Sequence, residues 1–193
     1  TGSTAAWSTN SLSDPAQRQL MQQVVAQARA NQAAKLPTNT ATVTAGFRDE
    51  KQAEAMRQLQ QRVGASLQVY LRSENNTPMQ LKGSPLAKAV ASARDEQTRN
   101  EATAKLFLRD NAAIMLLNDP ERELRLAHRQ TDELGGEVLR FTQQYHGLPV
   151  WPAEIGVHLN SGGDVVMIDG AYIASPDNVS VQPALTSASA ATK

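Results

Sequence analysis

Residues 138–159 read VLRFTQQYHGLPVWPAEIGVHL, and the alternation within this stretch decides the fold. Apolar side chains recur at every second position on both sides of a tight turn at His146–Pro149. Because successive side chains of a β-strand point to opposite faces, this pattern predicts two antiparallel strands with one packed face. The residues predicted to share the packed face are Leu139, Phe141, Gln143 and Tyr145 on the first strand, and Trp151, Ala153, Ile155, Val157 and Leu159 on the second.

Segments with the same period flank this hairpin on both sides, separated by residues that favour turns. They extend the two strands into an antiparallel meander in which one face packs and the other is polar. The predicted segments are a strand over Leu124–His128 with Leu124, Leu126 and His128 on one face, a turn at Asn160–Gly163, a returning strand at Val165–Ile168, and an earlier hairpin over residues 66–71 and 79–83 that closes at Gly83.

Apolar residues at helical spacing precede the meander. The longest such segment, Thr98–Leu117, carries apolar residues at spacings of three, four and seven and ends at Asn118-Asp119-Pro120. The other predicted helices are one that starts at Ser13-Asp14-Pro15, one over Asp49–Val63 that Gly64 stops, and one that Ser84-Pro85 opens. The predicted fold class is α+β: an antiparallel β-sheet meander packed against one long helix, with an additional N-terminal helical segment.

Changes in composition suggest three parts. Residues 1–52 form an N-terminal extension with a helix, residues 53–176 form the main domain, and residues 177–193 are rich in Ser, Ala and Thr and are typical of a linker or the start of a further domain.

Composition excludes several classes of function. The 193 residues contain no cysteine, so neither a disulfide nor a thiolate nucleophile is available. The 19 basic and 19 acidic residues are interspersed, which argues against binding to nucleic acid. No apolar run approaches the about 20 residues of a membrane span, so no membrane association is predicted. Composition alone leaves the cellular compartment open.

The sequence also lacks the common patterns of catalytic sites. The three histidines, His128, His146 and His158, never show the i, i+4 spacing that presents two imidazoles on one helix face, so no metal site is predicted. No Gly-x-Ser-x-Gly motif is present. A Ser-His-Asp arrangement is recognised by geometry and stays open at this point. We predict no catalytic residues and a chain that is not itself an enzyme.

Residues 132–150, DELGGEVLRFTQQYHGLPV, resemble the signature of the fungalysin/thermolysin propeptide domain. That family shows an acidic loop residue, a glycine, an Arg-aromatic-x-Gln strand, a Tyr-x-Gly turn and Pro-Val in this order. The segment from Glu154 to Asp169-Gly170 and the earlier Asn76-Thr77-Pro78 and Leu81-Lys82-Gly83 also look like this family. Two departures, Pro152 and Gly156, predict that the strand lies at an edge or contains a bulge near Trp151–Pro152.

The resemblance implies the propeptide of a secreted zinc metallopeptidase of the thermolysin type. Such a domain acts as an intramolecular chaperone and an inhibitor that keeps the zymogen inactive until it is cleaved. The implied partner is the cognate peptidase domain in cis, with zinc and calcium in that domain and no cofactor in this chain. The resemblance further implies a secreted or periplasmic monomer, and residues 177–193 look like the start of a PepSY-type prodomain.

The family signature supplies the candidate residues, which either contact the peptidase or specify the fold. They are Arg140, Gln143, Gln144, Tyr145, Pro149, Trp151 and Glu154. The face opposite the core, with Val150, Glu154 and His158, is expected to be free to meet the peptidase. One alternative is an extracellular protein-binding module of the same fold that is not coupled to a peptidase. An autonomous hydrolase is a third hypothesis.

Overall fold

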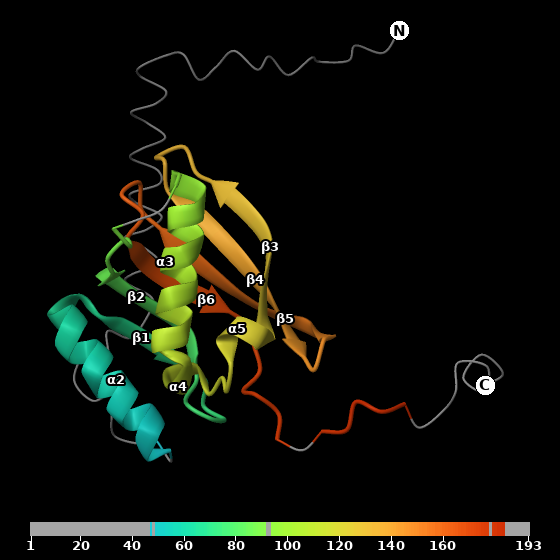
Figure 1. Cartoon of the computed structure of the whole chain (residues 1–193). Helices are drawn as coiled ribbons and strands as arrows, with labels where there is room; N and C mark the ends of the chain where they lie inside the picture. Colours follow the sequence, from blue (N-terminus) through green and yellow to red (C-terminus); the bar gives the residue numbers. More distant parts are fainter. Residues whose placement is uncertain (1–46, 48, 92–93, 178, 184–193) are drawn as a thin grey trace, which may run out of the picture. The chain divides into compact units, whose positions relative to one another are not determined.

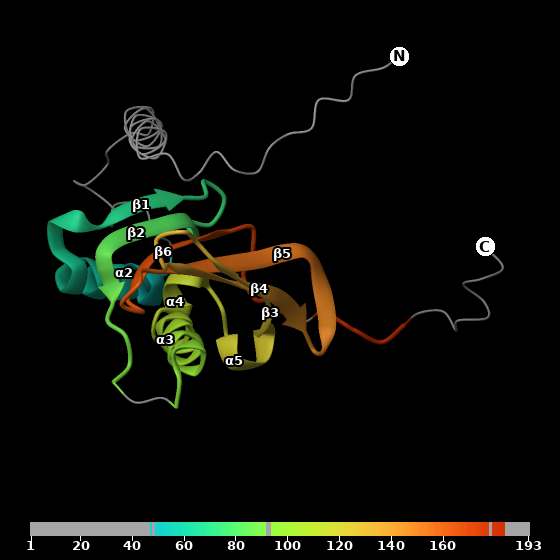
Figure 2. The ribbon, with the colours of Figure 1, turned by 90° about the horizontal axis from the view of Figure 1, so that it is seen from above.

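The computed structural model describes residues 47, 49–91, 94–177 and 179–183. Within these residues a six-stranded antiparallel sheet has the order β1-β2-β6-β5-β4-β3, and the helices lie on one of its faces (Figures 1 and 2). The architecture is therefore α+β. The strands are β1 (Gln68–Leu71), β2 (Pro78–Ala87), β3 (Leu124–Thr131), β4 (Glu137–Tyr145), β5 (Leu148–Leu159) and β6 (Val165–Gly170), and the helices are α2 (Glu50–Val63), α3 (Glu96–Asp110), α4 (Ala112–Met115) and α5 (Pro120–Glu123).

The predicted helix from Ser13, and most of the predicted extension and C-terminal segment, lie outside the described residues. Among the residues that are described, no helix combines the length and the apolar character that crossing a membrane requires.

Helix α2 forms where the sequence predicts it. The Asp49 side chain accepts a hydrogen bond from the Gln52 amide at 3.0 Å, and Gly64 ends the helix with a φ of 70°. Met56 and Leu59 on its inner face are fully buried. Gln52 is buried on the same helix, and its side chain donates to the Ile114 carbonyl of α4 at 3.0 Å.

The prediction of one long helix over residues 98–117 is wrong. Helix α3 ends at Asp110 because the Asn111 side chain donates to the Phe107 carbonyl at 2.7 Å and Asn111 leaves the helical conformation. The short helix α4 follows and ends at Leu116, whose φ is 54°. Asp119 and Pro120 then begin a new helix, α5, with the Asp119 side chain as its N-cap.

The prediction that Ser84-Pro85 opens a helix is also wrong. Strand β2 continues through Gly83 and Pro85 to Ala87, and the next helix begins at Glu96 with Asp95 as its cap. A Cβ atom on Gly83 would lie 2.7 Å from Cγ1 of Val63, so this glycine permits the close approach of α2 rather than a turn.

Register and burial confirm the packed face of β4 from Leu139 to Gln143 and that of β5 from Ala153 to Leu159, whereas Tyr145 is only half-buried. Leu139 pairs with Val157 and Phe141 with Ile155, and all four side chains are buried against the helices. The core combines them with residues from α2, α3 and α4. Its fully buried larger members are Met56, Leu59, Leu81, Leu108, Ile114, Met115, Leu139, Phe141, Ile155 and Ile168.

Two facing predictions are wrong because the alternation is interrupted by bulges. Trp151 is 89% exposed, since the register shifts between Thr142 and Gln144 where β5 carries extra residues. The predicted bulge near Trp151–Pro152 is thereby confirmed. In β3 a shift between Leu126 and His128 leaves His128 exposed and opposite Arg140, away from the face that Leu126 shares with Phe141.

Candidate interaction surface

The outer face of the sheet carries two ion pairs side by side. Arg140 on β4 contacts Glu154 on β5 at 2.9 Å, and His158 on β5 contacts Asp169 on β6 at 3.2 Å. Gly156 lies between them, and a Cβ atom there would come within 2.5 Å of Oδ1 of Asp169. The absence of a side chain at this position therefore lets four polar side chains from three strands converge.

The electrostatics of Asp169 follow from these neighbours. Its hydrogen bond to His158, together with the charges of His158 and Arg140, lowers the pKa of Asp169 below its ordinary value, although partial burial opposes the shift. The carboxylate is thus held in its charged form on the outer face.

An exposed apolar hairpin adjoins these ion pairs. We call residues 145–153 the Trp151 hairpin. Its turn is formed by His146 and Gly147, with φ values of 47° and 81°, which suits the twist of a two-residue hairpin. Leu148 is 52% exposed and Trp151 is 89% exposed. A groove runs between this hairpin and the ion pairs, lined on its polar side by Arg140, Glu154 and Asp169.

Gln143, one of the predicted site residues, faces inward and binds the segment that follows β6. Its side chain donates to the Ile173 carbonyl at 2.7 Å and accepts from the Ile173 amide at 3.0 Å. Ser175 then bonds to the Leu116 carbonyl at 2.8 Å and to the Glu123 carboxylate at 2.5 Å. Residues 171–175, here named the exit segment, are therefore bound to the domain beside the base of the Trp151 hairpin.

Arg72 and the buried side chain of Tyr172 also hold the exit segment against the domain. The Arg72 guanidinium stacks on the Tyr172 ring at 4.7 Å from its centre and also donates to the Gly170 carbonyl at 2.5 Å. Tyr172 is 5% exposed, and this burial raises the pKa of its hydroxyl. Neither Arg72 nor Tyr172 was predicted as a site residue, because their contact joins segments that are far apart in the sequence.

The structure brings some of the predicted residues together and separates others. Arg140, Glu154, Pro149 and Trp151 line one groove together with the inward-facing Gln143. Gln144 instead bonds to Arg125 at 2.9 Å and to the Arg122 carbonyl at 2.6 Å, beside the outer strand β3. Tyr145 packs edge-on against His146 at 4.3 Å between ring centres, at the hairpin turn.

Sequence reasoning missed the role of Asp169. The signal was present, because alternation along β6 places Asp169 on the face opposite Ile168. Its pairing with His158 required the register between β5 and β6, which the sequence does not show.

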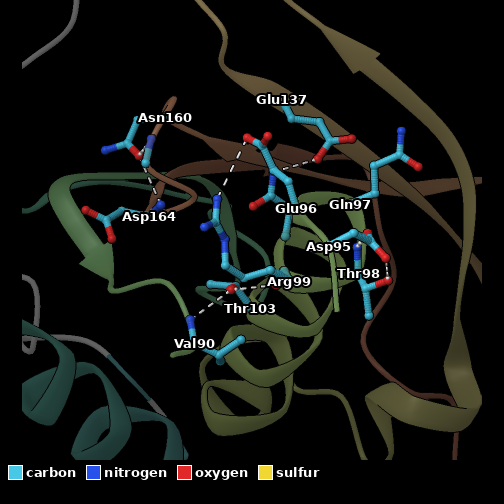
Figure 3. Close-up of polar contacts among 12 residues, drawn as sticks. Val90, Asp95, Glu96, Gln97, Thr98, Arg99, Thr103, Glu137, Asn160 and Asp164 are labelled. Carbon is cyan, nitrogen blue, oxygen red and sulfur yellow. Dashed lines mark hydrogen bonds and ion pairs between the residues drawn. The ribbon is translucent and has the colours of Figure 1, made fainter. Parts of the chain in front are cut away.

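A second polar cluster joins the start of α3 to the sheet, and Figure 3 shows one of its members, Glu137, beside the first turns of α3. Arg129 contacts Glu137 at 3.1 Å and Glu101 at 2.5 Å, and Asn100 donates to Glu137 at 3.0 Å. Lys105 completes the group through Glu101 at 2.6 Å. Because these contacts are internal to the domain, this cluster positions α3 on β3 and β4 rather than forming a binding site.

This cluster makes the stability depend on pH. The hydrogen bond and charge of Lys105, followed by those of Arg129, lower the pKa of Glu101 in the folded state. A lowered folded-state pKa stabilises the fold above the ordinary carboxyl pKa, and this contribution is lost as the pH falls through the folded value.

We therefore expect the urea midpoint of Glu101→Gln to depend less on pH than that of the unsubstituted protein between about pH 6 and about pH 3. Glu133→Gln, at an exposed position in the β3–β4 turn, is the matched control and should leave the dependence unchanged. Equal pH dependence of the Glu101→Gln variant and the unsubstituted protein would contradict this account.

In the described part of the chain, no three side chains of His, Cys, Asp or Glu are grouped so that they could hold a metal ion. The residues that line the groove include the hydroxyl-bearing Thr142 but neither serine nor cysteine.

A comparison with known families finds a match over the strands that carry this surface. Residues 122–172 match the family model described as the Fungalysin/Thermolysin Propeptide Motif. The match extends from the end of α5 through β3, β4, β5 and β6 to Tyr172, and so includes the ion pairs and the Trp151 hairpin. The resemblance predicted from the sequence is thereby confirmed over residues 122–172.

The similar proteins bear the names of neutral proteases and thermolysins. The chain is 33% identical over 97 residues to the thermostable neutral protease NprT of Geobacillus stearothermophilus, which covers 50% of the chain and 17% of the relative. It is 31% identical over 84 residues to thermolysin of Alicyclobacillus acidocaldarius, covering 44% of the chain and 15% of the relative. It is 28% identical over 85 residues to bacillolysin of Bacillus subtilis, covering 44% and 16%. The chain thus matches only about a sixth of the length of these relatives.

Proposed function

We propose that this chain is the propeptide region of a secreted thermolysin-like zinc metallopeptidase, which it helps to fold and holds inactive until cleavage. The observation that carries the proposal is the propeptide motif over residues 122–172, which includes β3, β4, β5 and β6 and so the ion pairs of the outer face. The chain itself is non-catalytic in this proposal, and its relatives are enzymes that it matches over a small part of their length.

The outer face has the properties that such a role requires. Its polar side chains are held in ion pairs across β4, β5 and β6, so little conformational entropy is lost when a partner binds. A preformed surface that stabilises the transition state for folding of a peptidase, relative to its unfolded state, accelerates that folding. The same surface, if it binds the native enzyme, stabilises it by mass action until proteolysis removes the domain.

The contact residues in this proposal are those of the groove and its rim. Arg140 and Glu154 supply the polar contacts, and Pro149 and Trp151 the apolar ones. Gln143, Gln144 and Tyr145 act on the fold, because Gln143 fixes the exit segment and the other two support the β3 edge and the hairpin turn.

The remaining features of the proposal come from the family resemblance. The partner is the cognate peptidase domain, linked in cis, and zinc and calcium belong to that domain. The domain is monomeric, and the precursor is exported to the periplasm or the medium. Residues 53–176 form the propeptide-like domain, and residues 177–193 link it to the next part of the precursor.

A second candidate is a protein-binding module of the same fold that is not coupled to a peptidase, because the exposed Trp151 hairpin would suit other protein partners as well. A His-Glu-x-x-His motif downstream in the same precursor favours the propeptide, since two histidines at this spacing bind catalytic zinc. Absence of that motif favours the binding module.

An inhibition assay tests the proposal. The purified chain, added to the mature peptidase of its own precursor, is expected to lower the rate of peptide hydrolysis in a dose-dependent manner. Activity should return as the chain is digested. The Ile155→Ala variant, which loses core packing, should be digested faster and inhibit for a shorter time. Unchanged hydrolysis at all ratios of chain to enzyme would contradict the inhibitory role.

A further inference from the structure

The exit segment, residues 171–175, is bound to parts of the domain that lie far apart in the sequence. The Arg72 guanidinium, which follows β1, stacks on the Tyr172 ring. The Gln143 side chain on β4 bonds to both the amide and the carbonyl of Ile173. Because Tyr172 is 5% exposed and belongs to the core cluster, the segment is part of the packed domain as well as its end.

Ser175 joins the exit segment to the helical layer. Its amide donates to the Leu116 carbonyl at 2.8 Å, and its hydroxyl donates to the Glu123 carboxylate at 2.5 Å and accepts from the Asn118 amide at 2.8 Å. A protease binds its substrate as an extended chain, through the backbone groups of that chain. Cleavage inside the exit segment therefore requires that these contacts open first.

The chain beyond Ser175 lacks such contacts. Among the described residues that follow it, the one hydrogen bond runs from the Gln182 amide to the Ser180 hydroxyl at 3.3 Å and is internal to this stretch. Val179 is 54% exposed. Both views show residues 179–183 leading away from the sheet and the helices (Figures 1 and 2). This backbone can enter the active site of a protease while the domain stays folded.

The residue types in this stretch restrict where it is cut. Pro176 and Pro183 lack a backbone N–H, so an active site that binds the amides of an extended chain accepts them poorly. Between these prolines, Val179 and Val181 are two residues apart and point to the same side of an extended chain. A pocket for a β-branched apolar side chain can therefore take either valine.

We propose that Val179–Gln182 is a proteolytic processing site for an endopeptidase that binds a valine side chain in its specificity pocket. One water is consumed: its oxygen joins the carbonyl carbon of Val179 or Val181, the C–N bond to the next residue breaks, and both protons of the water go to the leaving nitrogen. The products are a carboxylate on the valine and a new amino terminus. The exit segment sets the limit of cleavage, so the domain is released folded. This inference goes beyond the propeptide function and does not depend on it.

Limited proteolysis of the full 193-residue chain tests the proposal. The probe is leukocyte elastase, which cleaves after valine and other small aliphatic residues. Ala171, Ile173 and Ala174 of the exit segment also suit this enzyme, so it distinguishes the two segments by conformation. Digestion in water enriched in oxygen-18 marks each new carboxylate, and mass spectrometry identifies the hydrolysed bonds. Cuts after Val179 or Val181 should appear at least about tenfold faster than any cut within the exit segment.

Variants separate the accessible site from the segment that protects the domain. Changing both Val179 and Val181 to Asp should abolish the cuts between Pro176 and Pro183. Gln143→Ala should raise the rate of cleavage within the exit segment by about tenfold, because both bonds to Ile173 are lost.

Gln144→Ala is the matched control for Gln143→Ala. The Gln144 side chain bonds to Arg125 and to the Arg122 carbonyl and leaves the exit segment untouched, so the rate should change by less than about twofold. A cut after the buried Val157 would show that the Gln143→Ala variant has unfolded altogether. Ser175→Ala, which removes only the hydroxyl contacts, then replaces Gln143→Ala in the comparison.

Three results would overturn the proposal. The absence of cuts after Val179 and Val181 in the unsubstituted chain removes the site. Cuts within the exit segment that are as fast as those after the valines remove its protective role. Equal digestion of the exit segment in a folded variant that has lost its contacts and in Gln144→Ala removes the stated cause of that protection. The reaction contains no peptidase domain of the precursor, so none of these results bears on the propeptide function.

Discussion

The Ile155→Ala variant is expected to lose about 2–5 kcal/mol of unfolding free energy, through lost burial and a residual cavity. Ile155 is fully buried and pairs with Phe141 on β4 and with Gly170 on β6, at the centre of the sheet. Removing its side chain leaves a space that the neighbouring strands cannot close without breaking their register. Urea denaturation followed by circular dichroism measures the effect.

The adjacent residue provides the control. Glu154 lies on the opposite face, and its side chain is 43% exposed in an ion pair with Arg140. Exposed pairs of this kind contribute about 0–1 kcal/mol, so Glu154→Lys should change stability by no more than that. A large loss from Glu154→Lys and none from Ile155→Ala would mean that the assignment of faces along β5 is inverted.

The Gly170→Ala variant should also destabilise the domain strongly, by about 2–4 kcal/mol. Gly170 has a φ of 143°, and a Cβ atom there would overlap the Glu154 carbonyl oxygen and lie 2.9 Å from the Ile155 Cα. These atoms belong to the backbone of β5 and cannot move aside without disturbing the β5–β6 pairing. The same change would displace the exit segment that begins at Ala171.

The Gly147→Ala variant separates the effect of backbone strain at a positive φ from that of the close approach between strands. Gly147 has a φ of 81°, but a Cβ atom there would meet nothing within 4 Å beyond its own chain neighbours, so alanine introduces backbone strain alone. We expect a loss of about 1 kcal/mol. Equal losses from Gly170→Ala and Gly147→Ala in urea denaturation would show that the close approach of β5 and β6 contributes nothing.

The sheet could be predicted from the sequence because its signal is local. Alternation at Leu139, Phe141, Ile155 and Val157 follows directly from the geometry of a strand with one buried face, and each of these residues is buried. The ends of α2 were equally predictable, because Asp49 and Gly64 act within one turn of the helix that they bound.

Prediction failed where the local period of apolar residues changes. The bulge near Trp151 turns an apolar residue to the solvent, and hydropathy alone assigns such a residue to the core. Asn111 divides the expected long helix because its side chain bonds to a backbone carbonyl, a competition that the spacing of apolar residues does not reveal.

Only part of the candidate surface could be predicted, because some of its contacts depend on the register between strands. Arg140 and Glu154 were identified from the family signature, whereas the contribution of Asp169 depends on the register between β5 and β6. Gln143 was identified as a candidate, but its two bonds to Ile173 join segments 30 residues apart and assign it to the fold. Contacts between distant segments are the part of a site that a single sequence does not supply.

Refolding of the peptidase tests the central claim most directly. The denatured peptidase domain of the same precursor is diluted into buffer with and without the 193-residue chain, and the recovered activity is measured after the chain has been digested. If the chain is the propeptide, recovery should rise with its concentration and saturate near one chain per peptidase. Recovery that is the same with the chain, without it, and with an unrelated protein of equal size would contradict the account.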